Sequence, residues 1–551
     1  MTTEKDEVLI AGAGPCGMMM ALLLARLGVR SQLLERRDGI NQAPRAHAVN
    51  GKTLEIAASV GIDPAVVHAA ALPRALGGHV RFWSTLGGTY LGGLPYERQD
   101  DAVLGLSSQK LANVSQPRFE QLLLNEVLAH PLITLHRGVT VRSVAQSDED
   151  VTVTLDGASG SAVTLRGAYL VAADGAGSTL RDQLGIAMVG PEAIQHFMTI
   201  NFEADLSARL GDRAGVLHWV MDPDASGTFI AYDEGTNWVF MHSCPGMARP
   251  EPYSEAKARA VVAAALGESA VPFAIKNISP WTMTAQVAER FRQGRVFLLG
   301  DAAHRFPPAG GLGLNTGVGD AQNLAWKLAA VSQGLADPVL LDRYEQERRP
   351  VAETNSAQSL MNATKLFEFF PVLFGPDPAA TRAHFEAVCA APERSEALAA
   401  ALAAQLPHFD SLRLQIDYSY GGYDDSALPS HVFEPKLRVG DCLPHCEIEH
   451  GGKRRSILTL QAGSGCQLFL TQGTARPSGR WPELTVWVDG EDFTGPWSDQ
   501  VGAILPGVAG LLVRPDGHIA AQFFPETLTN EGLGAAIDAV YGRSQKAGEH
   551  A

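Results

Sequence analysis

The first 35 residues pass from a short apolar run to a longer apolar stretch and back to an apolar run. Residues 7–12 end in a glycine and predict a buried strand. Residues 15–27 are mostly apolar, with Gly28 at their end, and predict a helix. Residues 29–35 predict a second strand. The succession has the length of a parallel strand–helix–strand unit, so the chain begins as an α/β fold.

The pattern changes twice before residue 250. Residues 117–130 favour a helix, residues 138–156 alternate between apolar and polar as in a hairpin, and residues 166–173 predict another buried strand. Residues 186–245 are rich in β-forming residues separated by polar turns. We therefore expect an antiparallel sheet inserted into the α/β scaffold.

The second half returns to buried strands and helices. Residues 295–300 predict a strand, a loop rich in glycine and proline covers 306–313, and a long helix begins near Asn315 with apolar residues at helical spacing. Residues 338–405 are mainly helical in pattern. Residues 406–435 are irregular and resemble a linker, and strand-like runs resume beyond them.

Composition narrows the classes of function. The 551 residues are 46% hydrophobic and 19% charged, with a formal net charge of −16. This balance disfavours nucleic acid as a partner, because phosphates require clustered Lys and Arg. The six cysteines are too sparse for a disulfide framework, and Cys442, His445 and Cys446 lack the spacing of a metal site. With no leader or spanning segment in the pattern, we expect a soluble cytoplasmic protein without a metal or a membrane partner.

The first candidate site is a glycine motif between the first strand and helix. Gly12 allows a tight turn, Gly14 lets backbone approach a pyrophosphate, and Gly17 lets helix and strand pack closely. Glu35 ends the second strand and can accept hydrogen bonds from ribose hydroxyls. In this setting the motif predicts dinucleotide binding, and we add the neighbouring Pro15 and Arg36 to the candidate cofactor-binding residues.

Two further motifs follow strands. Asp174 and Gly175 come after the strand at 166–173, and Gly300 and Asp301 come after the strand at 295–300. A carboxylate at a strand end, such as Asp301, can bind ribityl hydroxyls. The glycines of the next loop let backbone N–H groups press against a flat ring, and the positive end of the following helix would stabilise an anionic ring.

These three motifs, together with the string from Gly300 to Lys327, resemble the flavoprotein aromatic hydroxylases typified by p-hydroxybenzoate hydroxylase and phenol hydroxylase. The resemblance implies an FAD-dependent monooxygenase that hydroxylates a phenolic or aromatic substrate with NAD(P)H and O2 through a flavin C4a-hydroperoxide. No second glycine motif is evident, and in this family NAD(P)H docks transiently on the surface. A homodimer is a further possibility.

The resemblance also implies the architecture. We expect a Rossmann-like FAD-binding domain with an inserted antiparallel β-sheet substrate domain, a helical segment, and a C-terminal thioredoxin-like α/β domain that lacks a redox Cys pair. The expected boundaries are residues 1–185 and 286–405 for the two parts of the FAD-binding domain with the helical segment, 186–285 for the substrate domain, 406–435 for the linker and 436–551 for the last domain.

Further site residues come from the same resemblance. Arg45 matches an arginine that contacts the FAD pyrophosphate, and Gln116 matches a glutamine near the flavin. The complete candidate cofactor set is Gly12, Gly14, Pro15, Gly17, Glu35, Arg36, Arg45, Gln116, Asp174, Gly300, Asp301, Gly311, Gly313, Leu314 and Asn315.

The inserted sheet is expected to line the substrate pocket. Strand alternation places His218 and Val220 on one face and Leu217 and Trp219 on the other. By alignment with the family's substrate strand, His218 would face the ring and accept or relay the phenol proton, although a structural histidine fits the pattern equally well. The other candidate substrate contacts are Val220, Tyr232 and Pro307.

Other functions share parts of this pattern. An FAD-linked reductase or oxidase and a halogenase use the same scaffold, but the W-x-W-x-I-P motif of the halogenases is missing. An FAD-binding sensor without turnover and an interaction protein also stay open. Incorporation of oxygen from 18O2, stimulation of NAD(P)H oxidation by phenols, and the yellow colour of bound flavin separate these alternatives.

Overall fold

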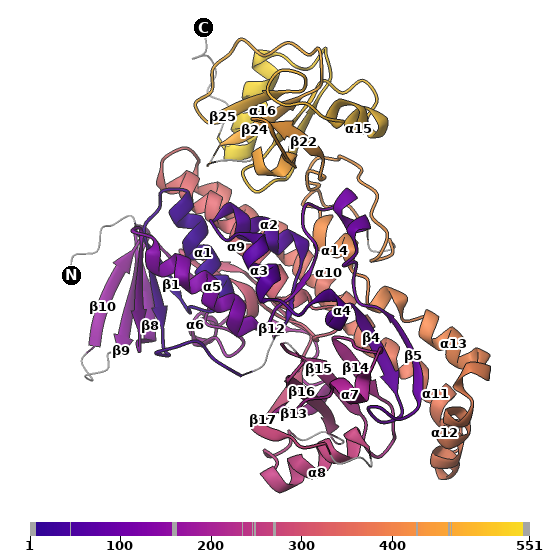
Figure 1. The fold of residues 1–551 in the computed structure, drawn as a ribbon. Coiled ribbons are helices and arrows are strands. Elements are labelled where there is room, and N and C mark those ends of the chain that lie inside the picture. Colours follow the sequence, from indigo (N-terminus) through magenta and orange to yellow (C-terminus); the bar gives the residue numbers. More distant parts are fainter. Residues whose placement is uncertain are drawn as a thin grey trace.

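The structure is a computed structural model that describes residues 7–43, 46–156, 162–233, 235–244, 246, 249–267, 271–425, 428–460, 463 and 465–543. Its centre is a six-stranded sheet in the order β19-β20-β11-β1-β2-β7 (Figure 1). Five of its strands run parallel, and β19 is antiparallel at one edge. The strands are β1 (Val8–Ala11), β2 (Ser31–Glu35), β7 (Ile133–Arg137), β11 (Tyr169–Ala172), β19 (Arg292–Gln293) and β20 (Val296–Leu298).

Helices and a small meander complete this domain. The helix α1 (Pro15–Arg26) is buried along most of its length, because nearly all of its side chains are apolar and it packs between the sheet and its neighbours. It lies against α5 (Gln116–Ala129) and α9 (Leu312–Ser332). A meander of β8 (Thr140–Gln146), β9 (Val151–Asp156) and β10 (Ala162–Gly167) extends to one side. These elements form the Rossmann-like part of the predicted fold.

The substrate domain is a seven-stranded sheet in the order β17-β13-β16-β15-β14-β4-β5. Its later strands are β13 (Gln195–Glu203), β14 (Leu217–Val220), β15 (Gly227–Ala231), β16 (Asn237–Cys244) and β17 (Ala274–Met283). The structure differs from the predicted boundary, because β4 (His79–Trp83) and β5 (Tyr90–Pro95) come from the first 185 residues. The strand β4 pairs in parallel with β14, which ties the two segments into one sheet.

The helical segment leads from the FAD-binding domain to the far end of the substrate sheet. It consists of α10 (Arg343–Lys365), α11 (Phe369–Phe374), α12 (Thr381–Ala390) and α13 (Glu396–Ala403), and α11 to α13 form an arm beside β4 and β5 (Figure 1). The described part of the predicted linker includes a 3-10 turn at Leu406–His408 and the short helix α14 (Leu412–Ile416). Among the described residues, no helix is both long enough and apolar enough to cross a bilayer.

The C-terminal domain has thioredoxin topology. Its four-stranded sheet has the order β25-β24-β26-β27, in which β24 and β25 are parallel and β26 and β27 are antiparallel to their neighbours. Residues 471–483 join β24 to β25 without a helix, and α15 and α16 follow later. The elements are β24 (Cys466–Leu470), β25 (Leu484–Val488), α15 (Trp497–Ile504), β26 (Gly510–Val513), β27 (Ile519–Phe523) and α16 (Asn530–Tyr541), preceded by the hairpin of β22 (Glu447–His450) and β23 (Lys453–Ser456).

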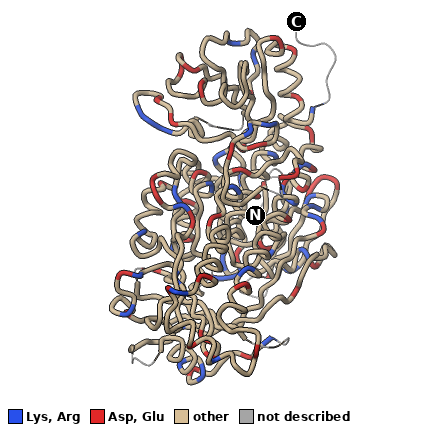
Figure 2. Tube along the Cα trace, turned by 90° about the vertical axis from the view of Figure 1, so that its right-hand side faces the viewer, with Lys and Arg blue, Asp and Glu red and all other residues tan. Residues whose placement is uncertain are grey.

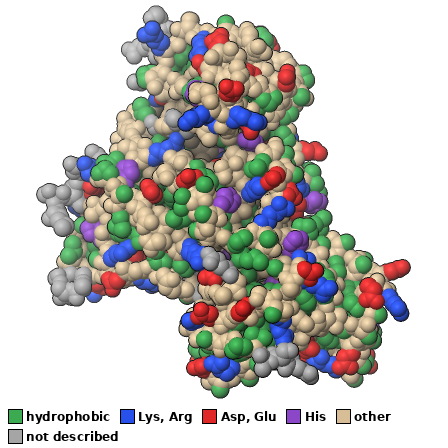
Figure 3. All heavy atoms as spheres, viewed as in Figure 1, with side chains coloured by type: hydrophobic (Ala, Val, Ile, Leu, Met, Phe, Trp, Pro, Cys, Tyr) green, Lys and Arg blue, Asp and Glu red, His purple; other side chains and the backbone are tan. Residues whose placement is uncertain are grey.

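This domain sits on one end of the molecule, above the C-terminal half of α9 (Figures 1 and 2). Apolar residues of both parts, including Trp326, Ala330, Leu468 and Tyr541, share one buried cluster. On the face shown in Figure 3, acidic and basic side chains are interspersed, so the net charge of −16 is not gathered into one field there.

Candidate cofactor and substrate site

The three sequence motifs meet at one edge of the central sheet. Gly12 follows β1, Asp174 follows β11, and Gly300 with Asp301 follows β20, and these strands are neighbours in the order β20-β11-β1. Because the strands are parallel, their carboxyl ends lie at the same edge. The structure therefore brings the motifs together in the crevice position at which open α/β sheets bind nucleotides.

Glycine is required at several of these positions by close backbone approach. A Cβ on Gly12, whose φ is +102°, would lie 2.3 Å from the carbonyl oxygen of Ala173, and one on Gly17 would lie 2.0 Å from that of Gly12. Gly14 and Gly313 have open space beside their Cα atoms. The first two glycines thus allow the chain to pack, whereas the last two leave room for a ligand.

Glu35 and Asp174 are two of the carboxylates at this edge. Glu35 accepts hydrogen bonds from the backbone N–H groups of Ala13 (2.8 Å) and Arg37 (2.9 Å), which holds the glycine loop against β2. A carboxylate has further lone pairs for ribose hydroxyls. Asp174 accepts from the N–H of Leu180 through Oδ2 (3.3 Å), while its buried Oδ1 has no partner, and burial raises its pKa. Arg36 is exposed beside them.

The loop before α9 presents backbone rather than side chains. Gly310 and Gly311 have φ values of +99° and +62°, and Gly311 caps α9 without a side-chain hydrogen bond. The first N–H groups of α9 are therefore available to an anionic ring edge. Leu314 is buried, and Pro307 is buried within the loop.

The side chain of Asn315, a candidate cofactor residue, is engaged within the protein. Its Oδ1 accepts from the Asn50 N–H (3.0 Å) and the Thr53 hydroxyl (2.7 Å). Its Nδ2 donates to the carbonyl oxygens of Ala48 (3.0 Å) and Gly311 (2.7 Å). The amide is thus occupied within the protein and positions the loop.

Asp320 is a site residue that the sequence motifs did not single out. It is fully buried on α9, and its Oδ2 accepts from the N–H of Gly300 (3.3 Å) and lies 2.7 Å from Nε2 of His304. Its Oδ1 accepts from Nε of Arg348 (2.7 Å), and the charge of Arg348 lowers the pKa of Asp320 against the effect of burial. Asp320 therefore fixes the Gly300-Asp301 turn to α9. An acidic residue within the apolar run of α9 was the available signal.

The segment around Ala46 lies over the same edge. Arg45, which was predicted to contact the pyrophosphate, falls outside the described residues. Gln116 accepts from the N–H of Ala46 (3.3 Å) through Oε1 and donates its own backbone N–H to the Ala46 carbonyl (3.0 Å). Tyr232 also donates to that carbonyl (3.3 Å). Gln116 and Tyr232 thus brace this segment.

His218 is in the wrong place to serve as the proton acceptor. Its Nδ1 accepts from the Trp83 indole (3.1 Å) and its Nε2 donates to the Gly215 carbonyl (3.0 Å), and the side chain is fully buried. Burial lowers its pKa to about 3, so the ring is neutral. The prediction that His218 faces the substrate is contradicted by these contacts, and the alternative of a structural histidine fits them.

The face of the substrate sheet on which His218 lies explains why the prediction for His218 fails. By strand pairing, His218 shares its face with Phe229, Phe240 and Ile200. This face is fully buried and forms one cluster with Val220 and with residues of α8 (Glu255–Leu266), which lies on the side of the sheet away from the FAD-binding domain (Figure 1). The prediction for Val220 is contradicted for the same reason.

The opposite face carries partly exposed apolar side chains. Trp219 lies opposite Thr228, which lies opposite Met241, and the neighbouring Phe82 contacts Phe369 of α11 with ring centroids 5.0 Å apart. The indole N–H of Trp219 is buried without a hydrogen-bond partner. The partly exposed members of this face are Phe197, Leu217, Trp219, Ile230, Met241 and Trp281, which we call the apolar wall.

These features fit FAD. The open space at Gly14 and Gly313, the unpartnered Oδ1 of Asp174 and the uncapped start of α9 supply room and polar groups for a dinucleotide whose flat ring meets the α9 loop. Gly12, Pro15, Gly17 and Glu35 would hold its adenosine and pyrophosphate, and Asp301 its ribityl chain.

Known proteins agree with this geometry. Residues 5–359 match the family model described as "FAD binding domain", and residues 436–544 match "Aromatic-ring hydroxylase, C-terminal". The chain is 31% identical to aklavinone 12-hydroxylase DnrF of Streptomyces peucetius over 88% of this chain and 94% of that protein. It is 34% identical to 2,4-dichlorophenol 6-monooxygenase of Delftia acidovorans over 68% of this chain and 64% of that protein. The crystal structure of the flavin-dependent monooxygenase PieE in complex with FAD and substrate aligns with a TM-score of 0.89 and 30% identity, over 99% of this chain and 100% of that one.

Proposed function

The chain belongs to the FAD-dependent aromatic-ring hydroxylases, and from this premise we propose that its substrate is a fused-ring phenol rather than a single-ring one. The enzyme is a monooxygenase with FAD as its cofactor and an aromatic compound as its substrate. We further propose that O2 is the oxygen donor and that NAD(P)H, the usual reductant of this family, is the electron donor.

The apolar wall carries the proposal. Its members lie on β17, β13, β16, β15 and β14, five neighbouring strands, so the wall is about 19 Å wide at the usual spacing of strands. That width suits several fused rings. Phe197 and Trp281 stand with ring centroids 5.4 Å apart and extend the wall at its far end. A relative named as an aklavinone 12-hydroxylase is similar over 88% of this chain, whereas the relative named as a 2,4-dichlorophenol 6-monooxygenase is similar over 68% of it.

Each part of the site has a task in this reaction. Bound FAD supplies the redox chemistry that links NAD(P)H to O2. The start of α9 stabilises negative charge on the ring, because its N–H groups are uncapped. The wall excludes water, which would otherwise divert the reaction toward H2O2. The unpartnered indole N–H of Trp219 donates to an oxygen of the substrate and orients the ring.

A comparison of phenol, 1-naphthol and 1,8-dihydroxyanthraquinone tests the proposal. We expect NAD(P)H oxidation by the FAD-loaded enzyme to be stimulated most by the three-ring compound, with little H2O2 and with one atom of 18O from 18O2 in the product. Stimulation by phenol alone would favour a single-ring substrate. Stimulation with stoichiometric H2O2 and no labelled product for every compound would refute hydroxylation of this class.

A further inference from the structure

The helix α10 buries an unusual number of polar side chains. Its buried face includes Arg348, Asn355, Ser359 and Asn362, which recur at intervals of three, four and seven residues and so lie in one row. Buried polar groups normally find hydrogen-bond partners. Arg348 has Asp320, and Asn355 donates to the Thr316 hydroxyl at 2.9 Å, so the first half of the row is explained by contacts with α9.

The second half of the row is not satisfied within the protein. The Oγ of Ser359 and the Nδ2 of Asn362 have no hydrogen-bond partner in the protein. Both side chains are also fully inaccessible to solvent. The Oδ1 of Asn362 accepts a hydrogen bond from Nε2 of Gln358 at 2.8 Å. This bond fixes the orientation of the amide and leaves its Nδ2 group without a partner. The two atoms lie one helical turn apart on the same face.

Asn362 lies against Gly310 in the loop before α9. A Cβ built on Gly310 would be 3.2 Å from Nδ2 of Asn362, and no backbone of the loop is close enough to accept its N–H. Beyond Asn362 the chain enters α11, where Phe369 contacts Phe82, the strand neighbour of Trp219 in the apolar wall. Asn362 therefore lies beside the loop that meets the ring of FAD, with Ser359 one turn before it on the same helix face, and the chain beyond them packs against the substrate sheet.

We propose that Ser359 and Asn362 form an oxygen-binding subsite for the substrate. The amide offers an N–H donor and the hydroxyl offers either a donor or an acceptor. Both groups are uncharged, so the ligand atom they suit is a neutral carbonyl or phenol oxygen rather than a carboxylate. The subsite thereby selects fused-ring compounds that carry an oxygen on the ring edge next to Gly310. This inference rests on the proposed function and adds the recognition of a second oxygen to it.

A subsite of this kind predicts a specific loss of discrimination. A ligand oxygen that forms hydrogen bonds with two buried polar groups improves binding roughly tenfold or more over an analogue that lacks this oxygen. The analogue leaves those two groups unpaired. In the variants Ser359→Ala and Asn362→Leu that advantage should shrink toward onefold. The decrease should come from weaker binding of the oxygenated ligand, while the analogue binds as well as before or better.

The experiment measures dissociation constants by perturbation of the flavin absorbance in the FAD-loaded enzyme, without turnover. The ligand pair is 1-hydroxyanthraquinone and 1-hydroxyanthracene, which differ in the quinone carbonyls. Thr364→Ala, a polar-to-apolar change on the exposed face of α10, is the matched control and should keep the wild-type ratio. FAD content and thermal midpoint verify that Asn362→Leu is folded, and Ser359→Ala provides a smaller change.

The outcomes separate this inference from the proposed function. Wild-type discrimination that is lost in Ser359→Ala and Asn362→Leu but kept in Thr364→Ala supports the subsite. Binding of both ligands with the same ratio in all four proteins overturns the subsite and leaves the fused-ring proposal standing. If neither fused-ring ligand binds the wild type while phenol does, the proposed substrate class fails and the subsite fails with it.

Discussion

The buried carboxyl group of Glu97 makes the stability of the folded protein depend on pH. This residue is 5% exposed at the end of β5, and its carboxylate accepts hydrogen bonds from the backbone and hydroxyl of Ser411 and from Gln415 at 2.9 to 3.1 Å. Burial raises its pKa from an ordinary 4.5 to about 7, and the nearby charge of Asp410 adds to the effect. Glu97 thus clamps the linker to the body through an acid that titrates near neutrality.

The sign and size of the effect follow from this difference. Since the pKa is higher in the folded protein, the folded state binds the proton more tightly, and the contribution to stability is complete below pH 4.5 and is lost as pH rises to 7. At about 1.4 kcal/mol per pH unit the total is roughly 3 kcal/mol, of which about 2.5 kcal/mol falls between pH 5 and pH 8. Glu97→Gln, which resembles the protonated acid, should gain roughly 2 to 3 kcal/mol in stability relative to the wild type between pH 5 and pH 8.

Urea unfolding at pH 5, 6, 7 and 8 measures the difference between variant and wild type, so that other titrating groups cancel. Glu449→Gln, at an exposed glutamate of β22, is the matched control and should follow the wild type at every pH. The reasoning is refuted if the Glu97→Gln and wild-type profiles run parallel, because a constant difference means that Glu97 does not change its protonation over this range.

Three further predictions test other parts of the site. Asp301→Ala should release FAD, measured as flavin absorbance retained after gel filtration, and full retention would remove Asp301 from the cofactor site. His218→Phe should destabilise the fold by about 1 to 3 kcal/mol, because Trp83 loses a buried acceptor, yet leave the ratio of H2O2 to NAD(P)H unchanged; a selective loss of hydroxylation would restore His218 to the reaction. Arg514→Ala breaks a bidentate buried pair with Glu347 (2.6 and 2.8 Å) and should cost about 3 to 5 kcal/mol in urea unfolding, whereas Arg454→Ala, which breaks an exposed pair with Glu447, should cost about 1 kcal/mol or less. Equal costs would show that the buried network contributes no more than a surface pair.

The fold was largely predictable because its signals are local. The strand–helix–strand start, the three turns after strands and the long helix at α9 each arise from a run of apolar residues with glycines at its end. The strands β4 and β5 were missed because their place depends on a parallel pairing of β4 with β14, more than 130 residues later. No short-range pattern in residues 79–95 specifies that partner.

The candidate site shows the same limit. Alternation along β14 correctly separated His218 from Trp219, because a strand turns successive side chains to opposite faces. Which face α8 would cover is decided by tertiary packing, and alignment with the family's substrate strand placed His218 on the other face. The indole N–H of Trp219 and the amide of Asn362 became candidates only when the structure left them buried without partners. Their residue types alone carried no such signal.

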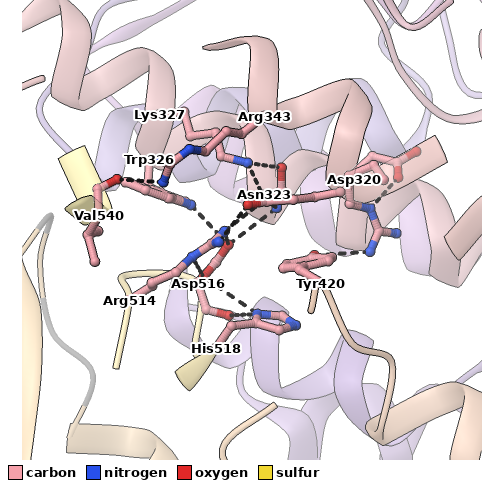
Figure 4. A network of polar contacts seen from close by, with 12 residues as sticks. Asp320, Asn323, Trp326, Lys327, Arg343, Tyr420, Arg514, Asp516, His518 and Val540 are labelled. Atoms are coloured by element: carbon pink, nitrogen blue, oxygen red, sulfur yellow. Dashed lines mark hydrogen bonds and ion pairs between the residues drawn. The ribbon is translucent and has the colours of Figure 1, made fainter. Parts of the chain in front are cut away.

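Figure 4 shows the polar contacts that join the C-terminal domain to α9. The C-terminal half of α9 buries donors on Asn323 and Trp326, and both reach Oδ2 of Asp516, at 3.3 and 3.0 Å. Lys327, one turn further, donates to Glu347 at 2.5 Å, and burial lowers its pKa to about 8. At the other end of the same helix, the amide of Asn315 and the carboxylate of Asp320 fix the loop that meets the flavin. The helix α9 is thus held by contacts at both ends, to Asp516 in the C-terminal domain and to the loop before it in the FAD-binding domain. The C-terminal domain is therefore joined by buried hydrogen bonds to the same helix whose first turn faces the cofactor site.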